Sequence, residues 1–411
     1  MFTRLATKSL LNRKGSVLLT IMAMSVSIFV LLGVEHIRDQ SKQSFNSTVS
    51  GVDLIVGART GSLNLLLYSV FRLGSPTSNI AWDSYQRVSS NPKVAWSIPI
   101  SLGDSHRGFR VLGTTTDYFK YFNYGKKRRL EFSSGKPFEY TFDLVLGAQV
   151  AKKLGYSLGA QVVLAHGLGR ASFSLHNKNP FTVVGILAPT GTPVDQTVHV
   201  SLQGVEAVHG GLQKPYVADD LPLVDFQGAE LQPKSITAFM LGLTSRMATF
   251  GVRRDINNYR NEPLTAILPG VALSELWQMM SVIESTLRLI SGLVLISALL
   301  GLSAMMLASI KEREKEIYLL RVIGAPPFYL FLLIELEALL ISCISMFVGT
   351  ITLYLSLLIA RDGLATNFGL HIGVNVFSFN NVIFLVLVAG STMVAAAIPS
   401  LMAFNDSSRR V

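Results

Sequence analysis

Four long apolar segments constrain this 411-residue chain more than any other feature of its sequence. The first, residues 15–34, carries no charge and is bounded by Lys14 and Glu35. At a rise of ~1.5 Å per residue, a helix of this length spans a hydrocarbon core about 30 Å thick. Each segment is therefore predicted to cross a membrane, and the other three cover about 289–310, 328–360 and 382–404.

A cleaved signal peptide is the alternative for the first segment. The apolar core of a signal peptide is usually about 7–15 residues long, and a small-residue cleavage site follows it. This segment is longer, and no convincing Ala-x-Ala site follows it. We therefore predict an uncleaved transmembrane helix at 15–35. In residues 1–14, apolar and basic residues alternate, which predicts a cytoplasmic amphipathic segment on the membrane surface: Phe2, Leu5, Leu10 and Leu11 with Arg4, Lys8, Arg13 and Lys14.

Basic residues beside the segments predict the orientation, because cytoplasmic loops carry an excess of Lys and Arg. The N-terminus, the link after the second segment and the tail are basic, whereas the short loop 361–380 holds only Arg361. Both termini are thus expected in the cytoplasm, at the inner membrane of the cell. The basic residues of the link and the tail are Lys311, Arg313, Lys315, Arg321, Arg409 and Arg410.

Composition argues against several other classes of protein. Charged residues make up 15% of the chain, against about 25% in an ordinary soluble domain, which argues against a purely soluble enzyme. The net charge of +10 comes largely from residues that flank the apolar segments, and no nucleic-acid partner is predicted. The single cysteine, Cys343, lies within an apolar segment, which leaves residues 36–278 without a disulfide or a cysteine metal site.

Residues 36–278 mix strand and helix patterns. The whole chain is therefore predicted to be a membrane protein, with four transmembrane α-helices and a large α+β extracytoplasmic domain between the first and second. That domain has two lobes if 191–193 and 219–222 are loops crossing between them. Strand patterns fall at 52–56, 94–100, 161–166, 181–187, 197–202 and 236–243, and helical patterns at 62–73, 148–154, 248–259 and 273–285.

The predicted boundaries complete this description. The helix before the link includes a stalk, and the link itself is a cytoplasmic coupling helix. The segments are 1–14, 15–35, 36–278, 279–310 with the stalk, the coupling helix 311–327, 328–360, the loop 361–380, 381–404 and the cytoplasmic tail 405–411.

Residues 36–278, here called the insert, contain few motifs that indicate a catalytic or metal-binding site. No G-x-S-x-G motif is present, and the basic run 126–129 is typical of a solvated loop, with an anionic envelope partner as the alternative. No histidines have H-x-x-x-H or H-E-x-x-H spacing, so structural histidines are favoured over a metal site, although metal handling stays open. The six histidines are His36, His106, His166, His176, His199 and His209.

The link 311–327 has the pattern of a short amphipathic surface helix. Opposite charges recur at i,i+3, as in Lys311 with Glu314, and Ile317 belongs to a single apolar stripe. Gly324 ends the helix and Pro326 prevents its continuation. Such a helix can dock a soluble partner; a plain solvated linker is the alternative.

The link resembles the FtsX-like permease family of ABC transporters, which includes MacB-type and LolC/LolE-type subunits. The family pattern, about E-R-x-x-E-I-x-x-L-R-A-x-G-A followed by E-A-L-L, matches Glu312, Arg313, Glu316, Ile317, Leu320, Arg321, Gly324, Ala325 and then 337–340. Weaker similarities lie at 9–14, 53–57, 144–155, 184–187 and 189–192. Two departures are Val322, where the family usually has Ala, and a partial match at 398–403.

The resemblance implies a homodimer or close heterodimer driven by a separate ABC ATPase dimer. No G-x-x-x-x-G-K-[ST] occurs, so ATP and Mg are expected in the partner, with no enzyme activity and no cofactor in this chain. The expected function couples ATP hydrolysis to export or envelope extraction of a lipoprotein, peptide or small molecule, with a periplasmic adaptor or substrate-delivery protein as a further candidate partner. Alternatives are a signalling complex that activates an envelope partner without translocation, and metal or haem trafficking. The residues implied in coupling are Glu312, Arg313, Glu316, Ile317, Leu320, Arg321 and Gly324.

Two further sites are predicted within the membrane segments. Small residues at i, i+4, i+7 and i+11 of the second segment predict a dimer interface, because they let two helices approach closely; packing against the first segment is the alternative. Glu337 lies inside the third segment, where it is either a polar tie to the link, with Arg321 as its partner, or a snorkelling interfacial acid. The small residues are Ser297, Gly301, Ala304 and Ala308.

Overall fold

The computed structural model describes two compact units. The first comprises residues from 1–41, 281–362 and 372–411, and the second residues from 42–280 and 363–371. The described residues are 10–11, 13–125, 127–166, 180–209, 232–313, 319, 322, 326–368, 373 and 375–409.

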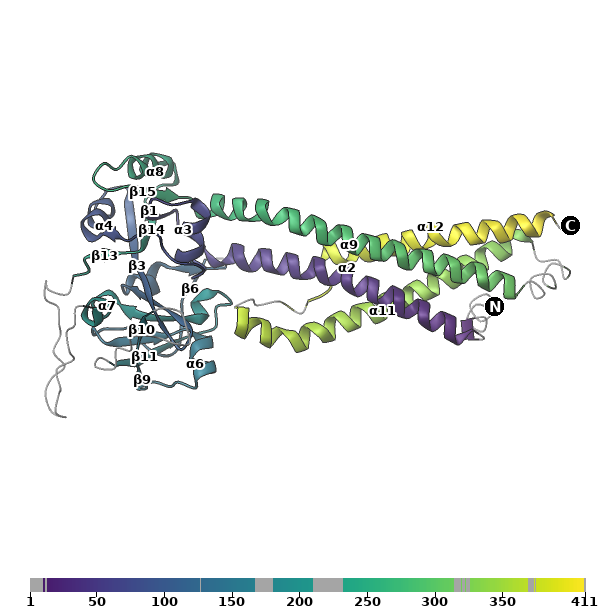
Figure 1. Ribbon diagram of the computed structural model, residues 1–411, viewed down its shortest axis with the longest axis horizontal. Helices are drawn as coiled ribbons and strands as arrows, with labels where there is room; N and C mark the ends of the chain where they lie inside the picture. Colours follow the sequence, from purple (N-terminus) through teal and green to yellow (C-terminus); the bar gives the residue numbers. More distant parts are fainter. Residues whose placement is uncertain are drawn as a thin grey trace. The chain divides into compact units, whose positions relative to one another are not determined.

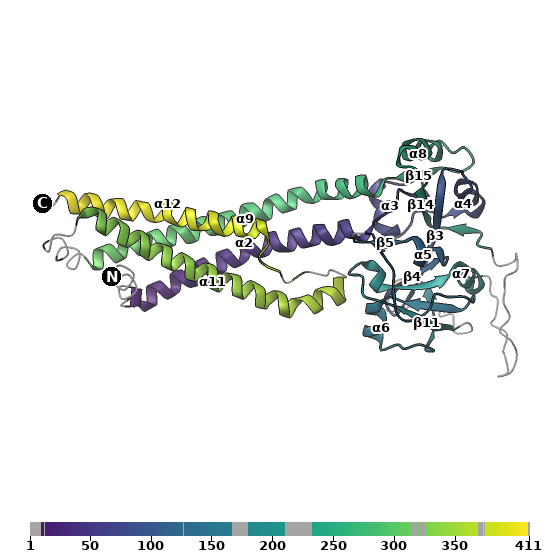
Figure 2. The same ribbon diagram turned by 180° about the vertical axis from the view of Figure 1, so that it is seen from behind.

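Four long helices form the first unit, and each is long and apolar enough to cross a membrane. The helix α2 begins, and α12 ends, at the same end of this bundle (Figures 1 and 2). This agrees with an even number of spans and confirms the predicted fold class. The helices are α2 (Lys14–Thr48), α9 (Pro269–Glu312), α11 (Pro327–Phe368) and α12 (Phe379–Arg409).

The bundle has one apolar core to which all four helices contribute. Met24 of α2, Leu302 of α9, Ile341 of α11 and Ala396 of α12 are each fully buried there. Gly349 lets α11 approach α2, because a Cβ at this position would lie 2.9 Å from the Ser25 carbonyl oxygen. Close backbone packing of this kind holds helices together in lipid, where no hydrophobic driving force acts between them.

Pro399 lies inside α12, where its ring nitrogen cannot donate to the carbonyl of Ala395. Ser303 of α9 donates instead, since its Oγ lies 2.8 Å from the Ala395 oxygen, closer than the 3.1 Å to the Leu299 oxygen of its own helix. A buried carbonyl in a membrane must find a partner within the protein. The proline therefore adds a specific contact between α9 and α12.

The helices extend beyond the predicted segments. The prediction of a loop at 361–380 is wrong for 361–368, because α11 continues to Phe368, and the predicted tail is helical to Arg409. Likewise, α2 continues to Thr48, well past residue 35. An uncharged run marks what can lie in hydrocarbon, whereas a helix continues wherever its backbone hydrogen bonds are satisfied.

An 11-stranded mixed sheet forms the centre of the second unit, in the order β15-β1-β14-β3-β4-β12-β8-β11-β7, with β10 beside β3 and β9 beside β11. The β4–β12 and β8–β11 pairs are parallel, and the other pairs are antiparallel. Its strands are β1 (Leu54–Ala58), β3 (Val94–His106), β4 (Phe109–Thr114), β7 (Phe132–Gly135), β8 (Asp143–Leu146), β9 (Gln161–Val162), β10 (Ala165–His166), β11 (Phe181–Leu187), β12 (Thr197–Ser201), β14 (Ala238–Leu243) and β15 (Leu264–Ile267).

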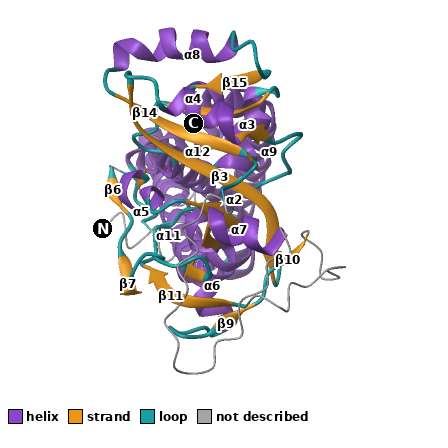
Figure 3. Cartoon of the chain, turned by 90° about the vertical axis from the view of Figure 1, so that its left-hand side faces the viewer, coloured by secondary structure: helices purple, strands orange, loops and turns teal. Residues whose placement is uncertain are grey.

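The long strand β3 joins the two ends of this sheet (Figure 3). Its first half pairs with β14 and its second half with β4. Two apolar clusters, one around Phe239 and one around Phe181, lie toward the two ends of one face of the sheet. The third, around Tyr118, contains the alternate residues of the same strands, such as Met240 and Val145, and therefore lies on the opposite face.

The predicted crossing loops do not connect these ends, because 191–193 joins β11 to β12 within one half of the sheet and 219–222 lies outside the described residues. The connection is β3, whose full length the sequence did not indicate.

Short helices and two small strand pairs complete the second unit. The predicted helix 148–154 coincides with α6, and 62–73 and 248–259 contain the shorter helices α3 and α8. The strands are β2 (Ile80–Ala81) with β13 (Ser235–Ile236), and β5 (Asn123–Tyr124) with β6 (Arg128–Arg129). The helices are α3 (Ser62–Ser69), α4 (Trp82–Ser89), α5 (Asp117–Tyr121), α6 (Ala148–Leu154), α7 (Leu202–His209), α8 (Thr249–Asn257), η1 (Pro193–Gln196) and η3 (Arg246–Ala248).

Candidate functional site

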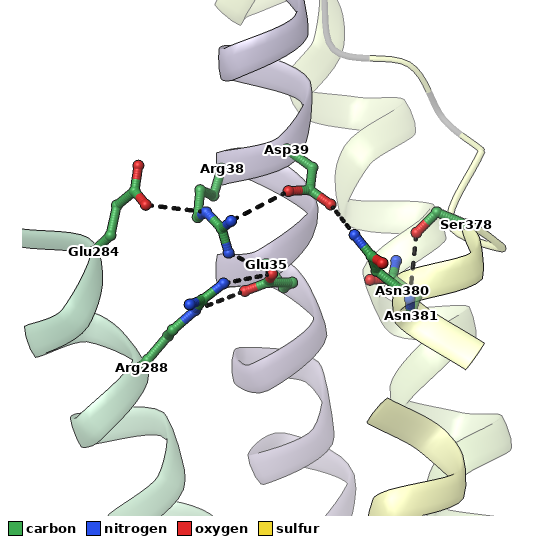
Figure 4. A network of polar contacts seen from close by, with 8 residues as sticks. All are labelled: Glu35, Arg38, Asp39, Glu284, Arg288, Ser378, Asn380 and Asn381. Carbon is green, nitrogen blue, oxygen red and sulfur yellow. Dashed lines mark hydrogen bonds and ion pairs between the residues drawn. The ribbon is translucent and has the colours of Figure 1, made fainter. Parts of the chain in front are cut away.

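A network of charged side chains joins α2, α9 and α12 at the end of the bundle where α2 runs on into residues 42–48, here called the insert-side end (Figure 4). Glu35 is at its centre and its side chain is only 5% exposed. Arg288 of α9 donates to both Glu35 carboxylate oxygens, at 3.2 Å from Nε and 2.9 Å from Nη2. This two-point geometry orients the Glu35 carboxylate toward α9.

Arg38 connects Glu35 to the rest of this network. It lies one turn after Glu35 on α2 and donates to Oε1 of that residue. Its Nε also lies 3.1 Å from Glu284 of α9, and its Nη2 lies 3.8 Å from Asp39. One guanidinium group therefore contacts three carboxylates, and two ion pairs, Arg38–Glu284 and Glu35–Arg288, join α2 to α9.

The start of α12 joins the same network. Asn380 donates to Asp39 Oδ2 at 3.0 Å, and the hydroxyl of Ser378 caps the helix by accepting from the Asn381 N–H. His36 also contacts the segment before α12, since its Nε2 lies 2.7 Å from the Gly373 carbonyl oxygen. The position of α12 at this end is thus fixed by hydrogen bonds to α2.

At the opposite end of the bundle, here called the link-side end, the described residues include a buried ion pair. Arg313 directly follows α9 and its Nη1 lies 3.0 Å from Glu337 of α11. The two side chains are 16% and 2% exposed. Glu337 thus contacts Arg313, and Arg321, the partner considered from the sequence, lies outside the described residues. Glu312 lies 3.9 Å from Arg13, with its own side chain 65% exposed.

Most of the predicted coupling helix lies outside the described residues. Only the first two of its implied coupling residues, Glu312 and Arg313, can be placed. The residues outside the described part are Glu316, Ile317, Leu320, Arg321 and Gly324.

The four small residues of the second span lie on an exposed face of α9. Ser297, Gly301, Ala304 and Ala308 are all exposed in the single chain, and a Cβ at Gly301 would meet no atom within 4 Å. The four residues therefore do not pack against the first span of the same chain, which was the alternative interpretation of this face. The face is open to a second chain or to lipid.

Two protein-family models match this chain and together show its family. Residues 17–220 match the MacB-like periplasmic core domain, and residues 288–407 match the FtsX-like permease C-terminal domain. The chain belongs to the FtsX/MacB-type permease family of ABC transporters. No curated protein sequence matches it.

Two solved structures are similar to the insert of this FtsX/MacB-type permease. The periplasmic region of MacB from Actinobacillus actinomycetemcomitans is 11% identical with a TM-score of 0.36, covering 56% of this chain and 94% of that chain. The extracellular domain of the noncanonic ABC-type transporter YknZ from Gram-positive bacteria is 10% identical with a TM-score of 0.31, covering 53% and 98%.

Histidines in the insert of the permease have structural surroundings. His106 donates from Nδ1 to the Val163 carbonyl oxygen at 2.7 Å, and its Nε2 lies 3.0 Å from the Tyr156 hydroxyl. Burial lowers the pKa of His106, and burial together with the charge of Arg72 lowers that of His199 to about 3. Among the described residues, no group of three or more His, Cys, Asp or Glu side chains is placed to hold a metal ion.

His209 titrates differently from these two. A hydrogen bond to Asp104 raises its pKa, with Nε2 lying 3.5 Å from the Asp104 carboxylate. His176 and the side chain of His166 lie outside the described residues. The described histidines of the insert thus bind their own sheet and helices.

Proposed function

We propose that this permease couples ATP hydrolysis by a separate ABC ATPase dimer to movement of its insert, for export or envelope extraction of a substrate. It works as a pair of subunits in the inner membrane, with both termini in the cytoplasm. Lipoproteins, peptides and small molecules remain the candidate substrates. The ATPase supplies ATP and Mg, and the permease supplies mechanical coupling.

The observation that carries this proposal is the continuity of α9. This helix has 44 residues, and its only proline is Pro269 at its first position. At ~1.5 Å per residue it is about 66 Å long. Residues 269–280 of this one helix belong to the second unit and 281–312 to the first. A helix without an internal proline or kink transmits displacement along its axis.

The Arg313–Glu337 pair supports the same proposal. It joins the C-terminal end of α9 to α11, the two helices that flank the link. A force on the link therefore acts on both helices together. At the other end of the bundle, the insert-side network joins the same α9 to α2 and, through α2, to α12.

Interrupting α9 tests the proposal. Leu293 is 58% exposed on α9, so Leu293→Pro removes a helical hydrogen bond without deleting a core side chain. Leu293→Ala is the matched control. Each variant is made in a Cys343→Ser chain with a dye on Met247→Cys, a position 92% exposed in the insert, and is reconstituted with its ATPase.

We expect both variants to bind the ATPase, and only Leu293→Ala to retain the ATP-dependent change in dye signal. An unchanged signal response in Leu293→Pro would show that α9 does not carry the coupling. If neither the parent chain nor Leu293→Ala stimulates the ATPase, the proposal of a coupled permease fails altogether.

A further inference from the structure

A cavity of about 280 Å³ opens between α2, α9 and α12, beside the insert-side network. Its size approaches that of small ligand pockets, which begin at about 300 Å³. All of its lining residues belong to the first unit. Its walls below the network are apolar and consist of Leu31, Val34, Leu295, Phe384, Leu387 and Val388.

The polar groups of the cavity are concentrated at its insert-side rim. Glu35 and Arg288 line this rim, and the cavity continues from them toward the middle of the membrane. Ser291 and Ser391 also line it, but each hydroxyl donates to a carbonyl of its own helix, at 2.9 and 2.7 Å. The site is thus amphipathic, with a charged opening and a hydrocarbon-like interior.

Two groups of opposite charge retain free hydrogen-bonding atoms here: Arg288 lines the rim, and Glu284 lies one turn of α9 beyond the residues that line the cavity (Figure 4). Arg288 uses Nε and Nη2 for Glu35, and its side chain is 49% exposed, so Nη1 is available to an acceptor. Glu284 uses Oε2 for Arg38 and is 22% exposed, so Oε1 is available to a donor. They are four residues apart on α9, which places them on one face within about 5–6 Å at Cβ.

The charge of the network selects among amphipathic ligands. Three carboxylates, Glu35, Asp39 and Glu284, face two guanidinium groups, Arg38 and Arg288, which gives 2 − 3 = −1. An anionic head group is therefore disfavoured. A head group with an ammonium and a phosphate joined by a short linker matches the free carboxylate oxygen and the free guanidinium amino group.

We propose that this cavity binds one bilayer aminophospholipid of the phosphatidylethanolamine type. Its phosphate accepts from Arg288, its ammonium donates to Glu284, and one acyl chain fills the apolar interior. A quaternary ammonium has no N–H to donate, so phosphatidylcholine lacks the second contact. The lipid bridges α9 and α12 beside the network. This site is independent of the transport cycle proposed above.

Retention of defined lipids by the purified full-length chain tests this inference. After delipidation, the chain is incubated with phosphatidylethanolamine, phosphatidylcholine or phosphatidylglycerol of equal chain length and examined by native mass spectrometry. Gly292 lines the cavity and has no atom within 4 Å of its Cβ position, so Gly292→Leu fills the site. Gly390→Leu is the matched control, because Gly390 is equally open but does not line the cavity.

We expect phosphatidylethanolamine to be retained about tenfold more than the other two lipids, equivalent to ~1.4 kcal/mol. Gly292→Leu should abolish this excess and Gly390→Leu should preserve it. Glu284→Gln should lower phosphatidylethanolamine to the level of phosphatidylcholine. Equal retention of all three lipids by the parent chain would overturn the inference. A loss of dimer in Gly292→Leu without a change in lipid would also overturn it and assign the cavity to a second chain.

Discussion

The two ends of the membrane bundle are held together in different ways. At the insert-side end, Arg38 contacts three carboxylates and Arg288 is half exposed, so several ion pairs can replace one another. At the link-side end, Arg313 and Glu337 form one buried pair. Losing Arg313 leaves the buried Glu337 carboxylate without this cation, whereas losing the half-exposed Arg288 leaves Arg38 beside Glu35.

This difference indicates which end resists movement. The Arg313–Glu337 pair favours one arrangement of α9 and α11, because Glu337 has no other ion-pair partner among the described residues. A network with exchangeable partners permits small shifts of α9 against α2 while charges stay paired. Under the proposed function, the link-side end would receive the force and the insert-side end would yield to it.

Removing one partner of the buried pair should have the largest effect. Arg313→Met leaves Glu337 buried without a cation and is expected to destabilise the chain by about 3–5 kcal/mol. Thermal unfolding in nanodiscs measures this loss, together with stimulation of the ATPase. Adding Glu337→Leu should restore much of the stability but not the stimulation. Wild-type stability of Arg313→Met would mean that the pair does not hold α9 to α11.

The middle of the bundle offers a reference that involves no charge. Gly349→Leu places a side chain against the Ser25 backbone and should destabilise the subunit by about 1–3 kcal/mol. Gly301→Leu points into open space and should leave subunit stability unchanged while weakening the dimer. In a Cys343→Ser chain, a cysteine at 301 should cross-link two subunits. Failure to cross-link with an intact dimer would move the interface to another span.

The insert contains histidines whose charge changes with pH, unlike the guanidinium groups of the bundle. The pKa of His199 is lowered to about 3 in the folded insert, against about 6.5 in the unfolded chain. The neutral imidazole therefore contributes fully to folding stability above pH ~6.5, and this contribution is lost as the pH falls toward 3. Below pH 6, the free energy of unfolding is expected to fall by up to ~1.4 kcal/mol for each pH unit. Denaturant unfolding followed by tryptophan fluorescence reports the insert, which holds Trp82, Trp96 and Trp277.

His199→Gln is the control for this titration, and it should remove that part of the pH dependence. His106 acts in the same direction, whereas the raised pKa of His209 acts in the opposite one, with stability lost as the pH rises. The difference between the parent chain and His199→Gln isolates one histidine. Identical pH profiles would show that His199 is not a buried neutral group.

The smallest effect is expected at the insert-side end. Arg288→Gln leaves Arg38 beside Glu35 and should cost about 1 kcal/mol or less. Because Arg288 is half exposed, salt should reduce this difference further, whereas the cost of Arg313→Met should depend little on salt. A salt-independent loss as large as that of Arg313→Met would remove the distinction between the two ends.

The spans and the family could be predicted from the sequence because both depend on local patterns. Runs without charge identify membrane helices, and the spacing around Glu312 and Gly324 identifies the link. In the insert, 181–187 coincides with β11 because apolar β-rich residues form one uninterrupted run. By contrast, β8 has only four residues, and α7 follows β12 without a break, so neither has a clear pattern of its own.

The polar contacts could not be predicted, because they depend on how helices are rotated against one another. Glu35 and Arg288 are 253 positions apart, and the only sequence signal was a charge at the edge of each apolar run. Arg313 and Glu337 are separated by the link, where Arg321 was an equally reasonable partner by distance along the chain. Helix periodicity gives the face of a residue, but not the helix that covers it.

The contact between Ser303 and the Ala395 carbonyl also has a consequence for biogenesis. A ribosome delivers α9 before α12, so the donor already lies in the bilayer when the carbonyl released by Pro399 arrives. That carbonyl has no water to bond in hydrocarbon. The last span to be made thus finds a donor for this carbonyl already in place on the second, which favours one order of assembly in the finished subunit.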